Sequence, residues 1–277
     1  MTLSTIRNNP AKQKKVKTKK QKAIAATCAV AFWLLVWHVI SLCVGSELVL
    51  VSPVKVVQTL FTVIFDPDFL KTVWYSAARI LGGFFTALTL GTVLGWVASR
   101  FWVVETLLRP ITAVIKATPV ASFIILVLLW FSGKNLSVII SMLMVFPVIY
   151  MNVLEGIRSA DEKLLEMAQV FRLSVGKKLL YIYLPAVAPF FVSACSVSLG
   201  LCWKSGIAAE VIGTPNGSIG AVFYQAKIFL QTSELLAWTV VVVAVSVAFE
   251  KLFMLFLRLV LKKLKMEDVL NLSLIHI

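Results

Sequence analysis

The chain has 277 residues, of which 60% are apolar, and its mean hydropathy is +0.93. Soluble domains are only about 45–50% apolar, so a soluble enzyme or binding domain is excluded and one membrane domain is predicted. The formal net charge of +14 comes from basic segments that flank apolar runs, and this arrangement indicates orientation in a membrane rather than nucleic-acid binding.

The two ends of the chain differ from the rest. Residues 1–22 contain eight lysines and arginines and no acid, which predicts a disordered basic tail in the cytoplasm. Residues 272–277 read LSLIHI, which matches the translation of a transposase end sequence used in sequencing libraries, so we treat them as an artefact. The predicted membrane domain is therefore 23–271, and we expect that the natural C-terminal part was cut near Asn271.

Six apolar runs are long enough to cross a bilayer, which takes about 20 residues of helix. They cover residues 23–44, 72–99, 111–131, 136–154, 186–204 and 235–261, and Pro119 interrupts the third. A cleaved signal peptide is the alternative for the first run, but no A-x-A site follows it, so an anchor is favoured. The predicted fold class is an all-α membrane protein with six transmembrane helices.

The second run carries a small residue at every fourth position, at Gly83, Ala87, Gly91 and Gly95. On a helix these residues form one stripe that lets another backbone approach closely, which is how membrane helices associate. We expect this stripe to be a helix-packing face.

The distribution of cations predicts the orientation. With the N-terminus inside, 19 of the 27 lysines and arginines lie on the cytoplasmic side. The positive-inside rule then places both termini and the connector at residues 155–184 in the cytoplasm.

That connector contains apolar residues at helical spacing, namely Leu164, Leu165, Ala168 and Phe171. Gly176 then breaks the run, and a second apolar patch precedes Pro185. Two short amphipathic helices are predicted, and the apolar face of such a helix needs a cover. The candidate covers are the membrane surface, the inner face of the protein itself, or a groove on a separate cytoplasmic subunit.

The same connector resembles the conserved cytoplasmic loop of binding-protein-dependent ABC importer permeases. The family pattern E-x-A, followed later by a hydrophobic residue, any residue and Leu-Pro, is matched by Glu166, Ala168, Ile182, Leu184 and Pro185. The resemblance covers about residues 50–260 and is greatest to the nitrate, sulfonate and taurine group. It extends through Val51-Ser52-Pro53, Ser76-x-x-Arg79, Gly83, Lys116-x-x-Pro119, Trp130-Phe131-x-Gly133, Phe146-Pro147, Cys202-Trp203, Ala209-Glu210 and Gly217-x-x-Gly220.

The resemblance implies a type I ABC importer transmembrane domain in a bacterial inner membrane. It further implies a homodimer of such permeases, an external substrate-binding protein, and an ATP-binding cassette ATPase subunit that docks on each loop. The ATPase-coupling residues would be Leu164, Leu165, Glu166, Ala168, Phe171, Arg172, Gly176 and Pro185.

Arg172 departs from the family pattern, because a glycine usually stands at this position. If the bend requires a positive φ there, a residue other than glycine costs on the order of 1 kcal/mol. The alternative is that the bend lies at Gly176.

The sequence contains no G-x-x-x-x-G-K-[ST] motif, so ATP would be bound by a partner and no cofactor is expected in this chain. The four cysteines lie in apolar runs and are expected to be buried, and with His38 alone in the first span no metal site is expected. An ion-gradient-driven secondary transporter is the alternative, using Arg79, Lys116, Glu250 or Lys251, although Arg79 and Lys116 can also snorkel to the headgroups. A membrane enzyme would need a cluster of acids, histidines or a nucleophile with its base, which the sequence lacks.

The translocation pathway is expected to use the third and fifth spans, with Lys116, Pro119, Trp203, Lys204 and Glu210 as candidate residues. Lys116 and Lys204 would attract a small organic anion such as a sulfonate, taurine or nitrate. A neutral heterocycle such as a thiamine precursor stays open as the alternative substrate.

Overall fold

The computed structural model describes residues 19–264, and every regular element in that range is a helix. The all-α prediction is therefore confirmed. The chain divides into two units, residues 1–55 and residues 56–277, which are described separately. The predicted basic tail at 1–22 and the LSLIHI segment fall largely or wholly outside the described residues.

The first unit consists of α1 (Lys19–Val44) and the turn that follows it. Its apolar part, Ile24–Val44, has 21 residues, which is enough to cross a membrane. Gly45 ends the helix with a φ of +65°, a value that glycine adopts without a steric penalty. The hydroxyl of Ser41 donates to the carbonyl oxygen of Leu50 at 2.9 Å, which closes the turn. The amphipathic helix α2 (Pro53–Ile64) starts at the end of this unit.

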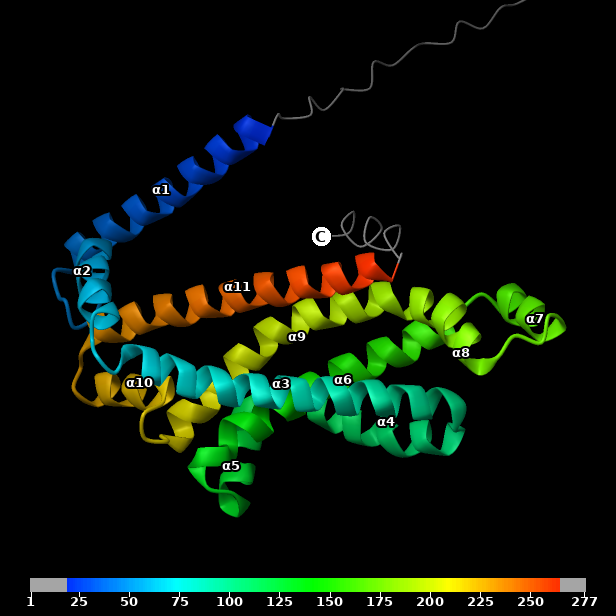
Figure 1. The fold of residues 1–277 in the computed structure, drawn as a ribbon. Helices are drawn as coiled ribbons and strands as arrows, with labels where there is room; N and C mark the ends of the chain where they lie inside the picture. Colours follow the sequence, from blue (N-terminus) through cyan, green and yellow to red (C-terminus); the bar gives the residue numbers. More distant parts are fainter. Residues whose placement is uncertain (1–18, 265–277) are drawn as a thin grey trace, which may run out of the picture. The chain divides into compact units, whose positions relative to one another are not determined.

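The second unit contains the remaining helices (Figure 1). In chain order they are α3 (Phe69–Arg100), α4 (Trp102–Ala117), α5 (Val120–Trp130), α6 (Gly133–Arg158), α7 (Glu162–Val170), α8 (Val175–Lys178), the π-helical turn η1 (Leu179–Tyr183), α9 (Leu184–Gly213), α10 (Ile219–Ile228) and α11 (Thr232–Lys263). Within residues 19–264, five helices are long and apolar enough to span a membrane, and a sixth span is obtained if α4 and α5 are counted together.

The third span differs from its prediction. It begins at Trp102 rather than near residue 111, and its two helices are bent by 110° at Thr118 and Pro119. Pro119 provides no N–H group, and the residue before a proline is driven into an extended conformation, as Thr118 is here at ψ 133°. The break was predicted, but its angle was not.

The ends of other spans also extend past their predicted limits. Helix α6 continues to Arg158, and the fifth span extends to Gly213, so Gly206 and Gly213 lie inside a helix although the predicted span ended at residue 204. Apolarity marks only the part of a helix that lies in lipid, whereas its hydrogen bonds continue into the polar region beyond.

The core of the second unit lies where α3, α6 and α9 meet. The stripe Gly83, Ala87, Gly91 and Gly95 is buried on α3 and faces α6. A Cβ atom built on Gly91 would lie only 2.9 Å from the Cβ atom of Ile149, so the small residues permit this close approach. Around this contact the buried side chains include Phe84, Val145, Leu199, Cys202 and Trp203.

Candidate functional site

The helix of the connector between the fourth and fifth spans, α7, packs on the rest of the chain along one face. Asp161 caps its first turn, because the carboxylate accepts a hydrogen bond from the backbone N–H of Lys163 at 2.9 Å. Ala168 is fully buried and packs with Ala160 and Ile182, and Leu165 lies against the same cluster. The chain itself therefore covers the Leu165 and Ala168 side of the predicted amphipathic helix.

A second apolar face of α7 stays uncovered in the structure. Leu164, Met167 and Phe171 follow one another at i, i+3 and i+7, and all three are exposed, as is Val170. We call Leu164, Met167, Val170 and Phe171 the docking face. Sequence reasoning missed Met167 and Val170, although their spacing from Leu164 and Phe171 would have indicated both.

Glu166 lies exposed on α7, and its carboxylate forms no hydrogen bond or ion pair with any residue between 19 and 264. An exposed, unpaired carboxylate beside an apolar face provides a charged contact for a partner.

The bend after α7 lies at Arg172, which has a φ of +50°. The N–H of Leu173 donates to the carbonyl of Ala168 at 2.9 Å, and that of Arg172 donates to Gln169 at 3.0 Å. This pair of bonds defines a Schellman turn, in which the left-handed residue is usually glycine. The alternative bend at Gly176 is wrong, since Gly176 lies inside α8 without a positive φ.

The predicted connector at 155–184 is shorter in the structure, because α8, η1 and α9 continue one another from Val175 to Gly213. The π-helical turn ends two residues before Pro185, and the N–H of Leu184 donates to the carbonyl of Leu179, five residues earlier. Pro185 has no N–H and its ring clashes with the carbonyl four residues before it, and a wider turn relieves both problems. Pro185 therefore shapes the helix that leads away from the loop.

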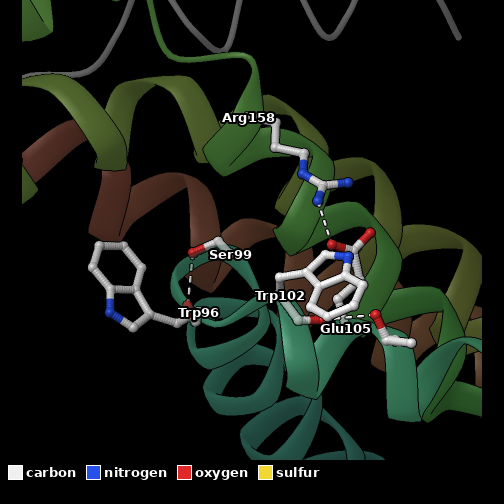
Figure 2. Close-up of polar contacts among 6 residues, drawn as sticks. Trp96, Ser99, Trp102, Glu105 and Arg158 are labelled. Carbon is white, nitrogen blue, oxygen red and sulfur yellow. Dashed lines mark hydrogen bonds and ion pairs between the residues drawn. The ribbon is translucent and has the colours of Figure 1, made fainter.

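The ends of α4 and α6 nearest the loop are joined by an ion pair. Figure 2 shows Arg158 of α6 reaching the carboxylate of Glu105 on α4, with a nitrogen to oxygen distance of 2.5 Å. This contact fixes the first half of the bent third span to α6 beside the loop.

Lys116 lies at the other end of α4, next to the break at Pro119. It is 11 residues beyond Glu105, which is about 16 Å along the helix, or roughly half of a 30 Å hydrocarbon core. Its side chain is exposed, and its ammonium group lies 3.5 Å from the sulfur atom of Met151 on α6. Because the span begins at Trp102 rather than near residue 111, Lys116 lies about four turns from that end of the span, farther than the snorkelling expectation assumed.

The other candidates for the pathway separate into exposed and buried residues. Lys204 is exposed on α9. One turn before it, a Cβ atom built on Gly200 would meet no atom of the described residues within 4 Å, so this side of α9 is open. Pro119 is also exposed at the break. Trp203, at 2% exposure, and Glu210, at 0%, lie inside the subunit, so burial removes both from the candidate lining.

Glu210 instead connects three helices near the end of the unit opposite the loop. Its Oε2 atom accepts hydrogen bonds from the hydroxyl of Ser76 on α3 at 2.6 Å and from the N–H of Gly220 on α10 at 3.3 Å. The Ser76 oxygen in turn accepts from the N–H of Ile219 at 2.9 Å. A Cβ atom on Gly220 would overlap Glu210, so only glycine fits there. We call Ser76, Glu210, Ile219 and Gly220 the outer network.

Within residues 19–264 no group of three or more His, Cys, Asp or Glu side chains is placed to hold a metal ion. The expected burial of the cysteines holds for Cys195 and Cys202 but not for Cys28 and Cys43, which are exposed on α1.

Known proteins resemble this chain over most of its length. Residues 87–266 match the family described as binding-protein-dependent transport system inner membrane component. The putative aliphatic sulfonates transport permease protein SsuC of Bacillus subtilis is 31% identical over 232 residues, which are 83% of this chain and 82% of that protein. The taurine transport system permease protein TauC of Escherichia coli is 27% identical, over 77% of this chain and 80% of that protein. The nitrate import permease protein NrtB of a Synechocystis strain is 25% identical, over 73% and 76%. This chain belongs to the family of binding-protein-dependent transport system inner membrane components.

Proposed function

We propose that this chain is the membrane subunit of an ATP-driven importer, in which it forms the translocation pathway and takes its energy from a separate ATPase that docks on α7. The substrate class is a small organic anion such as a sulfonate or taurine, or nitrate. An external binding protein delivers the substrate, and two copies of the chain enclose the pathway.

The docking face of α7 carries the proposal. Helices that bind in a groove present anchors at i, i+3 and i+7, which is the spacing of Leu164, Met167 and Phe171. Because the opposite side of α7 already packs on Ala160 and Ile182, the helix is held in place before a partner arrives, which reduces the entropy cost of binding.

The charge of the membrane domain supports an anionic substrate. Lys116 is exposed beside the bend of the third span, about four turns from the start of α4, and its side chain forms no ion pair with any of the described residues. An exposed cation inside a membrane-spanning segment is costly unless function requires it, and it would attract an anion. The relatives named for sulfonates, taurine and nitrate agree with this charge.

The test is uptake into vesicles that contain the full chain, its ATPase and its binding protein. Glu166→Arg and Phe171→Ala each remove a docking contact without disturbing the buried side of α7. We expect ATP-dependent uptake to fall at least about tenfold, together with loss of the ATPase on purification, since interface anchors are typically worth about 2 kcal/mol or more.

The matched control is Glu47→Arg, the same charge reversal at an exposed glutamate in the turn that follows α1. It should leave uptake within about twofold of the unaltered chain. Normal uptake and normal ATPase retention in both α7 variants would contradict the proposal. Accumulation driven by an ion gradient, without the ATPase, would instead support the secondary transporter.

A further inference from the structure

A cavity of about 520 Å³ opens between the end of α3 and the segment that joins the loop to α9. Its walls include Trp96, Arg100, Ile157, Lys178, Leu179 and Tyr183. All of these residues lie at the end of the second unit that carries the loop, which the distribution of cations places at the cytoplasmic side. Figure 2 shows Trp96 and Ser99, which also line the cavity, on the last turn of α3.

The cavity has a positive charge that its own residues do not neutralise. Arg100 and Lys178 line it from two different elements, and no acidic residue between 19 and 264 lines it. Neither side chain forms an ion pair or a hydrogen bond with another residue in the range 19–264. Arg158 provides the contrast, because it is paired with Glu105 (Figure 2). Two unpaired cations that face one space are complementary to a phosphate group.

The rest of the wall is apolar and aromatic. The rings of Trp96 and Tyr183 meet edge to face, with centroids 5.5 Å apart, and Ile157 and Leu179 line the same space. Tryptophan and tyrosine are enriched at the level of the lipid headgroups, and Trp96 lies one turn from the end of a membrane-spanning helix. A ligand that satisfies both parts of the wall has an anionic head and a hydrocarbon tail.

We propose that this cavity binds an anionic phospholipid of the cytoplasmic leaflet, with its phosphate between Arg100 and Lys178 and an acyl chain along Trp96 and Leu179. A soluble phosphate compound would use the two cations but not the apolar wall. A basic pocket between helices at the cytoplasmic side is typical of sites for anionic headgroups. The bound lipid joins the end of α3 to α8 and η1, and so holds the segment that leads from the loop into α9.

The experiment is a titration of the purified full chain with dioleoylphosphatidylglycerol, followed by native mass spectrometry. The variant Arg100→Gln/Lys178→Gln removes both cations of the cavity. We expect about fivefold weaker binding for each cation removed, and therefore about 25-fold for the pair. The control Arg109→Gln/Lys177→Gln removes one arginine and one lysine that are exposed but do not line the cavity, and its affinity should stay within about twofold.

Two further arms separate the sources of the phosphate group. Glycerol 1-phosphate at millimolar concentration should not displace the lipid; if it does so with comparable affinity, the cavity is a site for a soluble anion and the lipid proposal fails. The titration is repeated on the complex with the ATPase subunit, where the lipid should be retained. Displacement by the ATPase would show that the cavity belongs to a protein interface, and equal losses in the two double variants would show only general charge attraction.

Discussion

Replacing Ser76 with alanine removes the hydroxyl at the centre of the outer network. That hydroxyl donates to Glu210 at 2.6 Å and accepts from the N–H of Ile219 at 2.9 Å, and all three residues are fully buried. The variant therefore loses a hydrogen bond to a buried carboxyl group and leaves a first-turn N–H of α10 without its acceptor.

The magnitude follows from these two losses. A hydrogen bond to a charged group is worth about 1.5–3 kcal/mol, and an unsatisfied buried N–H costs about 1–3 kcal/mol. Hydrogen bonds between membrane helices average less, about 0.6 kcal/mol, because the unfolded chain in lipid also finds partners. We expect Ser76→Ala to lower the free energy of unfolding by about 3 kcal/mol, which is a fall of roughly 6–12 °C in Tm for a chain of this size.

The matched control is Ser198→Ala. Ser198 is also fully buried in a membrane helix, but its hydroxyl has no hydrogen-bond partner among the described residues. Both variants gain the same helix propensity and lose the same atom, so their difference isolates the outer network. We expect Ser198→Ala to change Tm by less than about 3 °C.

The assay is thermal unfolding of the purified full chain in one detergent, followed by loss of helical circular dichroism and by size-exclusion recovery. Glu210→Gln provides a further check, because the carbonyl oxygen of glutamine can keep the bonds from Ser76 and Gly220, and its loss of stability should be smaller than that of Ser76→Ala. Equal Tm values for Ser76→Ala and Ser198→Ala would refute the reasoning.

Two more predictions concern the turn at Arg172 after α7 and the cation Lys116 beside the bend of the third span. Arg172→Gly should raise Tm by about 2–4 °C, since glycine relieves about 1 kcal/mol of strain at φ +50°. Leu230→Gly, at φ +54°, should also raise Tm. A lower Tm in both variants would contradict the Schellman interpretation. Lys116→Gln should reduce sulfonate uptake about tenfold, which is the loss expected for one charged hydrogen bond. The control Lys134→Gln, at the exposed start of α6, should leave uptake unchanged. Equal uptake in both variants would show that Lys116 does not line the pathway.

Hydropathy predicted the spans because transfer into lipid is a property of each segment by itself. The stripe on α3 was likewise readable, since small residues at every fourth position have one geometric consequence, and the structure places them against α6. For the connector, a local pattern was not enough to predict what covers its apolar face. Its amphipathic spacing left three covers open, and only the resemblance to a family favoured a partner subunit.

The features that the sequence did not reveal depend on distant contacts or on an angle. Ser76 and Glu210 are 134 residues apart in the chain, so nothing local distinguishes Glu210 from a residue that lines a pathway. Pro119 predicts a break in the helix, but the angle of 110° between α4 and α5 depends on how α5 packs against α6 and α9.

The fifth span links the three sites described above. From Val175 to Gly213 the chain is one helical element of 39 residues, which is about 58 Å of helix, with the loop before it and the outer network near its other end. Its hydrogen-bond ladder is interrupted at the π-helical turn Leu179–Tyr183 and again at Pro189, and helices bend at both kinds of feature. That turn forms a wall of the cationic cavity. If an ATPase moves α7 as we propose, a ligand bound in the cavity acts at the point where that motion either passes into α9 or is absorbed by bending.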